Sequence, residues 1–122
     1  MASTVAVDFD GVIHAYSKGW QDGTIYDEPI PGAFDALMLL METFAVMVHT
    51  TREPAPVARW IKEHGGIETC WHEDESTLPE FWNDRDCILV TRRKLPAVAY
   101  IDDRAIRFET WGQALDDLER LA

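Results

Sequence analysis

The chain has 122 residues, 47% of them hydrophobic, and carries a formal net charge of −11 at pH 7. The length and apolar content fit a single domain, placed at residues 1–122, and the acidic balance argues against broad contact with a nucleic-acid backbone. No stretch approaches the apolar length of a membrane span, and the N-terminus lacks a basic region followed by a long apolar segment, so we expect a cytoplasmic protein without a membrane partner.

The first half of the chain predicts two strands with a helix between them. Thr4 to Phe9 is a short apolar run and predicts the first strand. Gly, Tyr, Trp and Asp dominate residues 14–28, which indicates an irregular flap over the end of that strand. Pro31 suits a helix start, and apolar residues at helical spacing continue this helix to about Thr43. A second buried strand is expected from Phe44 to His49.

The second half repeats this alternation around a less regular middle. A helix is predicted from Pro56 to His64, with Gly65-Gly66 as its stop. Within residues 67–86 we assign a short strand at 67–71 and a helical turn at 79–82. The remaining predicted elements are strands at 87–91 and 97–101, a small edge strand at 106–108, and a final helix at 111–121 with Leu115 and Leu118 facing inward.

These elements predict an α/β domain built around a mostly parallel central sheet. In such a sheet, ligands bind at the carboxyl ends of the strands. Four predicted strands are followed by polar residues, which are Asp8 and Asp10, Thr50 to Arg52, Arg92 to Lys94, and Asp102 and Asp103. We therefore expect these side chains to gather at one edge of the sheet.

Asp8 and Asp10 end the first strand and are followed by Gly11. Two carboxylates brought to one crevice repel each other unless a cation or a proton shares the site. The pattern therefore indicates a chemical site, although an acidic turn that uses Gly11 for its backbone freedom has the same sequence.

The two cysteines, Cys70 and Cys87, are too few for a disulfide framework, and we expect both to be reduced thiols. With His64 and His72 they form a conceivable zinc set, but the spacing matches none of the regular zinc patterns.

Four short motifs occur in order along the chain, each in the context of a strand end. They are Asp8-Phe9-Asp10-Gly11-Val12, Thr50 after Val46 to His49, Lys94, and Ile101-Asp102-Asp103. In this the chain resembles the haloacid dehalogenase superfamily, whose dominant activity is magnesium-dependent hydrolysis of phosphate esters. The first and fourth motifs are specific in combination, whereas a single Thr and a single Lys are weak signals. The resemblance implies a three-layer Rossmann-like fold with a short flap after the first strand.

The resemblance also implies a role for each motif residue. Asp8 would attack phosphorus to form an aspartyl phosphate, and Asp10 would protonate the departing oxygen and later take a proton from water. Thr50 would hydrogen-bond a phosphoryl oxygen, and Lys94 would place positive charge beside the nucleophile.

Magnesium is the implied cofactor, because a hard cation with oxygen ligands holds carboxylate and phosphate together against their repulsion. The family pattern places Mg²⁺ on Asp8, on the backbone carbonyl of Asp10 and on Asp102, with Asp103 nearby or bound through water.

Two of these roles have alternative candidates. Thr51, which we assign to substrate binding, would replace Thr50 as the phosphate ligand if the strand ended one residue later. Arg92 or Arg93 would replace Lys94 as the cation, although the family spacing before the fourth motif favours Lys94.

Residues beside the motifs have two interpretations each. Arg52 and Arg104 either bind substrate or pair with acids, because Arg suits both phosphate and carboxylate. We assign Arg52 and Gly11 to substrate binding. His14 and His49 border the expected crevice, where a structural histidine is the simpler interpretation of each.

The substrate is expected to be a small phosphorylated metabolite such as a nucleotide. The gaps between motifs leave no room for a large cap domain, so the site should be open. Tyr16 to Tyr26, with Trp20 between, either stack on a base or sugar or pack the flap. The runs Thr50-Thr51-Arg52-Glu53 and Asp102-Asp103-Arg104 resemble the phosphatase half of polynucleotide kinases, so a polynucleotide end stays open as a substrate despite the acidic balance.

Other functions stay open beside a phosphatase. One is a binding or regulatory module that keeps the fold without turnover, and another is a phosphotransferase that passes the group from Asp8 to an acceptor other than water. Dehalogenation is disfavoured because Asp10, the residue that serves phosphoryl transfer, is present.

Overall fold

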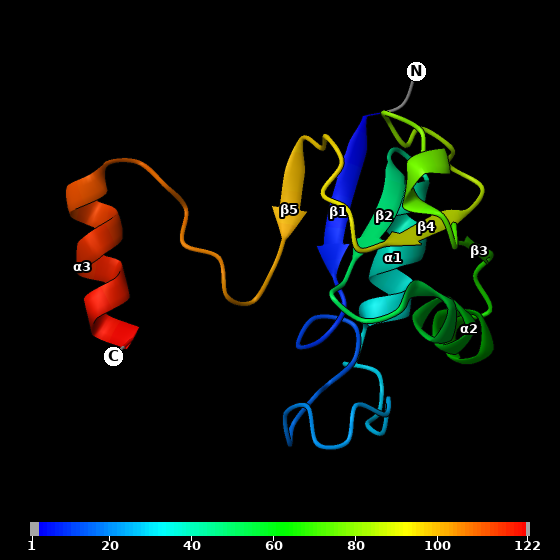
Figure 1. Cartoon of the computed structure of the whole chain (residues 1–122), viewed down its shortest axis with the longest axis horizontal. Helices are drawn as coiled ribbons and strands as arrows, with labels where there is room; N and C mark the ends of the chain where they lie inside the picture. The colour runs from blue at the N-terminus through cyan, green and yellow to red at the C-terminus, as the bar shows by residue number, and fades with distance from the viewer. Residues whose placement is uncertain (1–2, 122) are drawn as a thin grey trace.

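The computed structural model describes residues 3–121, which form a five-stranded, all-parallel sheet and three α-helices (Figure 1). The elements are β1 (Thr4–Asp8), α1 (Ala33–Met41), β2 (Ala45–His49), α2 (Pro54–Gly65), β3 (Thr69–Cys70), the 3₁₀ turn η1 (Glu75–Thr77), β4 (Ile88–Thr91), β5 (Ala99–Ile101) and α3 (Trp111–Leu121). The strand order across the sheet is β3-β4-β2-β1-β5. The predicted α/β class with a parallel sheet is therefore confirmed.

The strands β1, β2 and β4 form the buried middle of the sheet. They are rich in Val and Ile, whose branched side chains suit strands that are buried on both faces. Parallel pairing places Asp8 opposite His49 and His49 opposite Thr91, and it places Ile101 of β5 opposite Val7. The polar residues that follow these strands therefore start from the same edge of the sheet.

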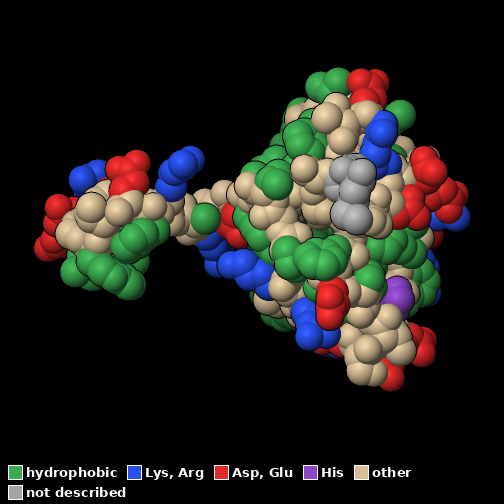
Figure 2. Space-filling view, turned by 90° about the horizontal axis from the view of Figure 1, so that it is seen from above, with side chains coloured by type: hydrophobic (Ala, Val, Ile, Leu, Met, Phe, Trp, Pro, Cys, Tyr) green, Lys and Arg blue, Asp and Glu red, His purple; other side chains and the backbone are tan. Residues whose placement is uncertain are grey.

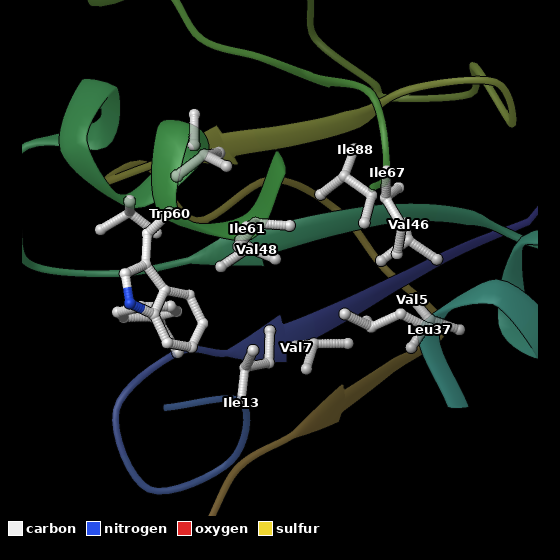
Figure 3. Close-up of a cluster of buried hydrophobic side chains, with 14 residues drawn as sticks. Val5, Val7, Ile13, Leu37, Val46, Val48, Trp60, Ile61, Ile67 and Ile88 are labelled. Atoms are coloured by element: carbon white, nitrogen blue, oxygen red, sulfur yellow. The ribbon is translucent and has the colours of Figure 1, made fainter. Parts of the chain in front are cut away.

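The helices α1 and α2 cover one face of the sheet, and the main core lies beneath them (Figure 3). Leu37 of α1 and Trp60 and Ile61 of α2 belong to one buried cluster with side chains of the sheet, among them Val5, Val7, Val46, Val48 and Ile88. The helix α2 starts with Pro54 in its first turn and ends before Gly66, whose φ of 66° allows its N–H to close the last turn on the Lys62 carbonyl. The predicted glycine stop is thus confirmed.

Loop segments cover the opposite face of the sheet. Ala6, Met47 and Leu89 are buried there together with Leu95. The partly buried residues packed against them are Cys70, Leu78, Trp82, Ala97 and Tyr100, most of which lie in the connections that flank β4.

Two local predictions in the irregular regions were wrong. The helical turn expected at 79–82 lies at η1 instead, because the Asp74 carboxylate accepts a hydrogen bond from the backbone N–H of Ser76 and caps the turn there. Residues 106–108 form no strand and belong to an irregular segment, 102–110, that leads away from β5.

The helix α3 has the predicted bounds but not the predicted environment. Leu115 and Leu118, expected to face inward, are 61% and 56% exposed. The segment 102–110 carries α3 away from the sheet (Figure 1), and Figure 2 shows hydrophobic side chains gathered along one side of this separate helix. The amphipathic pattern identified the apolar stripe but could not identify what it contacts. Within residues 3–121, every helix is too short or too polar to cross a bilayer.

Candidate functional site

A cleft of about 260 Å³ opens at the carboxyl ends of β1, β2 and β5. The residues that line it are Asp8, Asp10, Tyr16, Trp20, His49, Thr50, Thr51, Asp102 and Arg104. They come from three of the four motifs and from the loop between β1 and α1, except Thr51 and Arg104, which directly follow motif residues. The sheet therefore brings most of the residues expected at the site into one cleft.

Asp8 and Asp102 of the cleft form an acidic centre with Asp103, which lines a neighbouring hollow. One carboxylate oxygen each of Asp8, Asp102 and Asp103 lies within 4.8 Å of the other two. Burial, and then the negative charge of Asp102, raise the pKa of Asp8 from its ordinary value of 3.8 to about 6, against the hydrogen bond that Phe9 donates to it. The site thus concentrates negative charge on oxygen ligands, which is the donor chemistry that suits a hard cation such as Mg²⁺.

Gly11 lets Asp103 approach the first motif. Its φ is 87°, and a Cβ at this position would lie 2.2 Å from Oδ2 of Asp103. Any other residue would therefore strain the backbone and displace the carboxylate. The contact between Gly11 and substrate that the sequence indicated stays a prediction.

The Asp10 carboxylate is held apart from the acidic centre by two side chains. Its Oδ1 lies 2.9 Å from Nδ1 of His14, and its Oδ2 accepts a hydrogen bond of 2.8 Å from Nε of Arg52. Arg52 therefore pairs with an acid, which is one of the two roles that the sequence left open. The metal contact expected from the Asp10 backbone carbonyl stays a prediction.

Thr50 and Thr51 both line the cleft but differ in how they are held. Thr50 is buried, its N–H donates to the Thr91 carbonyl, and its Oγ1 accepts from the backbone N–H of Arg52 at 3.1 Å. Its hydroxyl hydrogen stays available for an oxygen in the cleft. Thr51 is exposed, so Thr50 is the better-oriented donor of the two.

Lys94 lies outside the residues that line the cleft. Its Nζ lies 4.9 Å from the centroid of the Tyr100 ring, and that ring lies edge-on to His49, which does line the cleft. The alternative cations Arg92 and Arg93 both contact Glu75 of η1. A cation beside Asp8 therefore stays a prediction.

Sequence reasoning missed the pairing of His14 with Asp10. A spacing of four residues brings side chains together on a helix, but these residues lie in an irregular loop, so the spacing carried no signal. His14 is fully buried, which agrees with a structural histidine, yet one of its nitrogens contacts a candidate catalytic acid. His49 lines the cleft, as expected for a residue that borders the crevice.

The zinc set considered from the sequence does not come together within residues 3–121, where the aspartate trio is the group with metal-ligand spacing. The thiols of Cys70 and Cys87 are unpaired and partly buried. Burial raises the pKa of Cys70 to about 12, so this thiol stays protonated at neutral pH.

Comparisons of the chain with protein-family models, with curated proteins and with solved structures found no match.

Proposed function

We propose that the chain is a magnesium-dependent phosphomonoester hydrolase of the haloacid dehalogenase type that works through an aspartyl phosphate on Asp8. The supporting observation is the meeting of Asp8 with Asp102 and Asp103, from the first and last motifs, beside a cleft that also holds Asp10 and Thr50. Exposed acidic residues are common on protein surfaces, but here they surround a half-buried carboxylate whose pKa is raised.

The residues that would hold Mg²⁺ are Asp8, Asp102 and Asp103, together with the Asp10 backbone carbonyl. When bound, the ion supplies positive charge that offsets both the carboxylates and the phosphoryl oxygens.

The chain's own residues carry the two chemical steps. An Asp8 oxygen attacks phosphorus, the new Asp8–phosphorus bond forms as the ester bond breaks, and Asp10 gives its proton to the departing oxygen. Asp10 then takes a proton from water, whose oxygen attacks phosphorus and releases phosphate and free Asp8. The Thr50 hydroxyl donates a hydrogen bond to a phosphoryl oxygen in both steps.

Lys94 is the candidate for the additional cation of the site. Its side chain lies over Tyr100, so it would have to leave that ring in order to approach Asp8. A Lys side chain has the flexible four-carbon stem that such a movement needs.

The finer architecture is part of the proposal. The domain would be a single Rossmann-like unit in which the predicted flap, residues 14–28, belongs to the loop between β1 and α1 and borders the cleft. Tyr16 and Trp20 of this segment line the cleft together with Asp8, Asp10 and Asp102. The aromatic side chains could stack on a base or sugar, so the proposed substrate is a nucleotide or another small phosphorylated metabolite.

Hydrolysis of 4-nitrophenyl phosphate by the full chain, with Mg²⁺ and with a chelator, tests the proposal. We expect turnover only with Mg²⁺, and we expect Asp8→Asn to reduce it by at least about 1,000-fold, because an amide cannot serve as the nucleophile. Asp116→Asn on the exposed side of α3 is the matched control and should keep full activity.

A phosphoenzyme trapped by rapid acid quench should be present in the unsubstituted chain and missing in Asp8→Asn. Turnover that survives Asp8→Asn would reject Asp8 as the nucleophile. If the unsubstituted chain showed neither turnover nor Mg²⁺ binding, the chain would be a binding module instead.

A further inference from the structure

The candidate acid Asp10 is held by two buried side chains that belong to different segments. His14 contacts Oδ1 at 2.9 Å and Arg52 donates to Oδ2 at 2.8 Å, while the side chains of these partners are 0% and 4% exposed. Burying a guanidinium is costly unless it is paired and hydrogen-bonded. Both oxygens of Asp10 therefore have a fixed direction, and we call this arrangement the Asp10 clamp.

The same two side chains also hold the loop that follows the first motif. The backbone N–H of Asp27 donates to Nε2 of His14 at 3.0 Å, so this nitrogen is the acceptor and Nδ1 carries the hydrogen that is donated to Asp10. Arg52 donates through Nη1 to the Gly23 carbonyl at 2.7 Å. Each partner in the Asp10 clamp thus contacts the carboxylate on one side and segment 15–31 on the other.

Arg52 is better placed to act on Asp10 than on a substrate. Its guanidinium carbon lies 4.6 Å from the centroid of the Trp20 ring, which lines the cleft, whereas Arg52 lines a second hollow with Ile25 and Pro56. Trp20 lines both hollows, so the indole separates the side chains of the cleft from the hollow that Arg52 lines only where the two hollows adjoin it. A cation in this position orients the acid and supports the aromatic wall.

We propose that His14 and Arg52 are positioning residues, which aim the Asp10 carboxyl at the leaving oxygen and couple its direction to the placement of segment 15–31. The inference rests on the proposed function, in which Asp10 protonates that oxygen. A carboxylate has two lone pairs on each oxygen, so two clamp contacts leave sites for the proton and for the substrate. The side chain of Asp10 is 19% exposed, which leaves it reachable from the cleft.

Leaving-group dependence is the readout that a merely structural residue would not change. Arg52→Gln should lower the rate with phenyl phosphate, a poor leaving group, by roughly 100-fold, because general acid catalysis contributes about 10²–10⁴-fold. With 4-nitrophenyl phosphate, whose departing oxygen needs little protonation, the loss should stay below about 10-fold. Arg59→Gln, at an exposed position of α2, is the matched control and should keep both rates.

A second measurement keeps the inference testable if Arg52→Gln fails to fold. In NMR spectra of the unsubstituted chain, the Nε–H of Arg52 should exchange with solvent much more slowly than that of exposed Arg59, and Asp10→Asn should accelerate its exchange. Exchange as fast as that of Arg59 would overturn the Asp10 clamp.

The outcomes separate this inference from the proposed function. If the unsubstituted chain is active and Arg52→Gln lowers both rates by the same factor, the positioning role fails and the phosphatase proposal stands. If the unsubstituted chain hydrolyses neither ester, the phosphatase proposal fails and the positioning role fails with it, whatever the NMR measurement shows for the contact itself.

Discussion

The two sides of the cleft are supported by very different parts of the molecule. Asp8 is the last residue of β1 and Thr50 directly follows β2, and the residues of both strands are almost all buried. Asp102 and Asp103 follow β5, an edge strand in which Ile101 is 44% exposed, and they continue into the segment that leads to α3.

The two sides of the candidate site are therefore held in place by different interactions. The side with the nucleophile is fixed by the core, whereas the side that completes the acidic centre is held mainly by the pairing of β5 with β1. Local stability follows the amount of buried apolar surface, so the edge should open more readily than the centre of the sheet. A cation that bridges Asp8 and Asp102 would link the less stable edge strand β5 to the buried strand β1.

The largest expected effect compares two phenylalanines from the two regions. Phe9 is fully buried, stacks on His14 and meets Trp60 edge-on with ring centroids 5.3 Å apart. Phe9→Ala should lower the free energy of unfolding by about 3–5 kcal/mol. Phe108→Ala, at a side chain that is 56% exposed, should change it by less than about 0.5 kcal/mol.

Urea unfolding followed by circular dichroism measures both values on the full chain. Similar losses in the two variants would mean that Phe108 is packed in solution, and the contrast between the two regions would then be wrong.

A smaller effect is expected from the cation itself. If the proposed site binds Mg²⁺ only in the folded chain, Mg²⁺ at ten times its dissociation constant should raise the free energy of unfolding by about 1.4 kcal/mol. Asp102→Asn should reduce this gain, while Asp116→Asn on α3 should leave it unchanged. Hydrogen exchange at the amides of Tyr100 and Ile101 should slow when Mg²⁺ is added, since these residues belong to the edge strand that the cation would hold.

Thermal unfolding with Mg²⁺ and with a chelator provides the measurement. A gain that persists in Asp102→Asn would redirect the assignment to Asp103, and the absence of any gain in the unsubstituted chain would contradict a bridging cation.

The sequence predicted the features that depend on short-range pattern. Continuous branched runs identified β1, β2 and β4, and the rule that parallel strands end at one edge predicted that Asp8 and Asp102 would meet. These inferences succeeded because they need only the type of each element and the direction of the strands.

The features that sequence reasoning missed depend on the paths of loops and on what lies opposite a surface. Arg52 reaches Asp10 from 42 positions away, and only the course of the intervening chain decides that contact. The spacing of Leu115 and Leu118 identifies an apolar face on α3 but does not say which surface that face packs against. Lys94 follows β4 as expected, yet the local turn directs its side chain over Tyr100.

The smallest expected effect is a pH dependence of stability that arises from Asp8. Its pKa is raised from 3.8 to about 6 in the folded chain, so between these values the folded state binds the proton more tightly than the unfolded state does. Without Mg²⁺, stability should therefore fall as the pH rises from about 4 to about 6 and should change little from this cause at higher pH. Because Asp8 is only half-buried, solvent screening should keep this change in unfolding free energy smaller than the effects of Phe9→Ala and of Mg²⁺.

The slope of unfolding free energy against pH, measured in chelator, should become flatter over this interval in Asp8→Asn. Asp27→Asn is a control with the opposite pH dependence. Hydrogen bonds from Ser17 lower the pKa of Asp27 to about 2, so its contribution to the free energy of unfolding is lost only as the pH falls below about 4. Equal slopes between pH 4 and 6 in the unsubstituted chain and in Asp8→Asn would mean that burial and the acidic neighbours do not raise the pKa of Asp8. The environment of Asp8 would then give no electrostatic reason for a cation to be bound between Asp8 and Asp102.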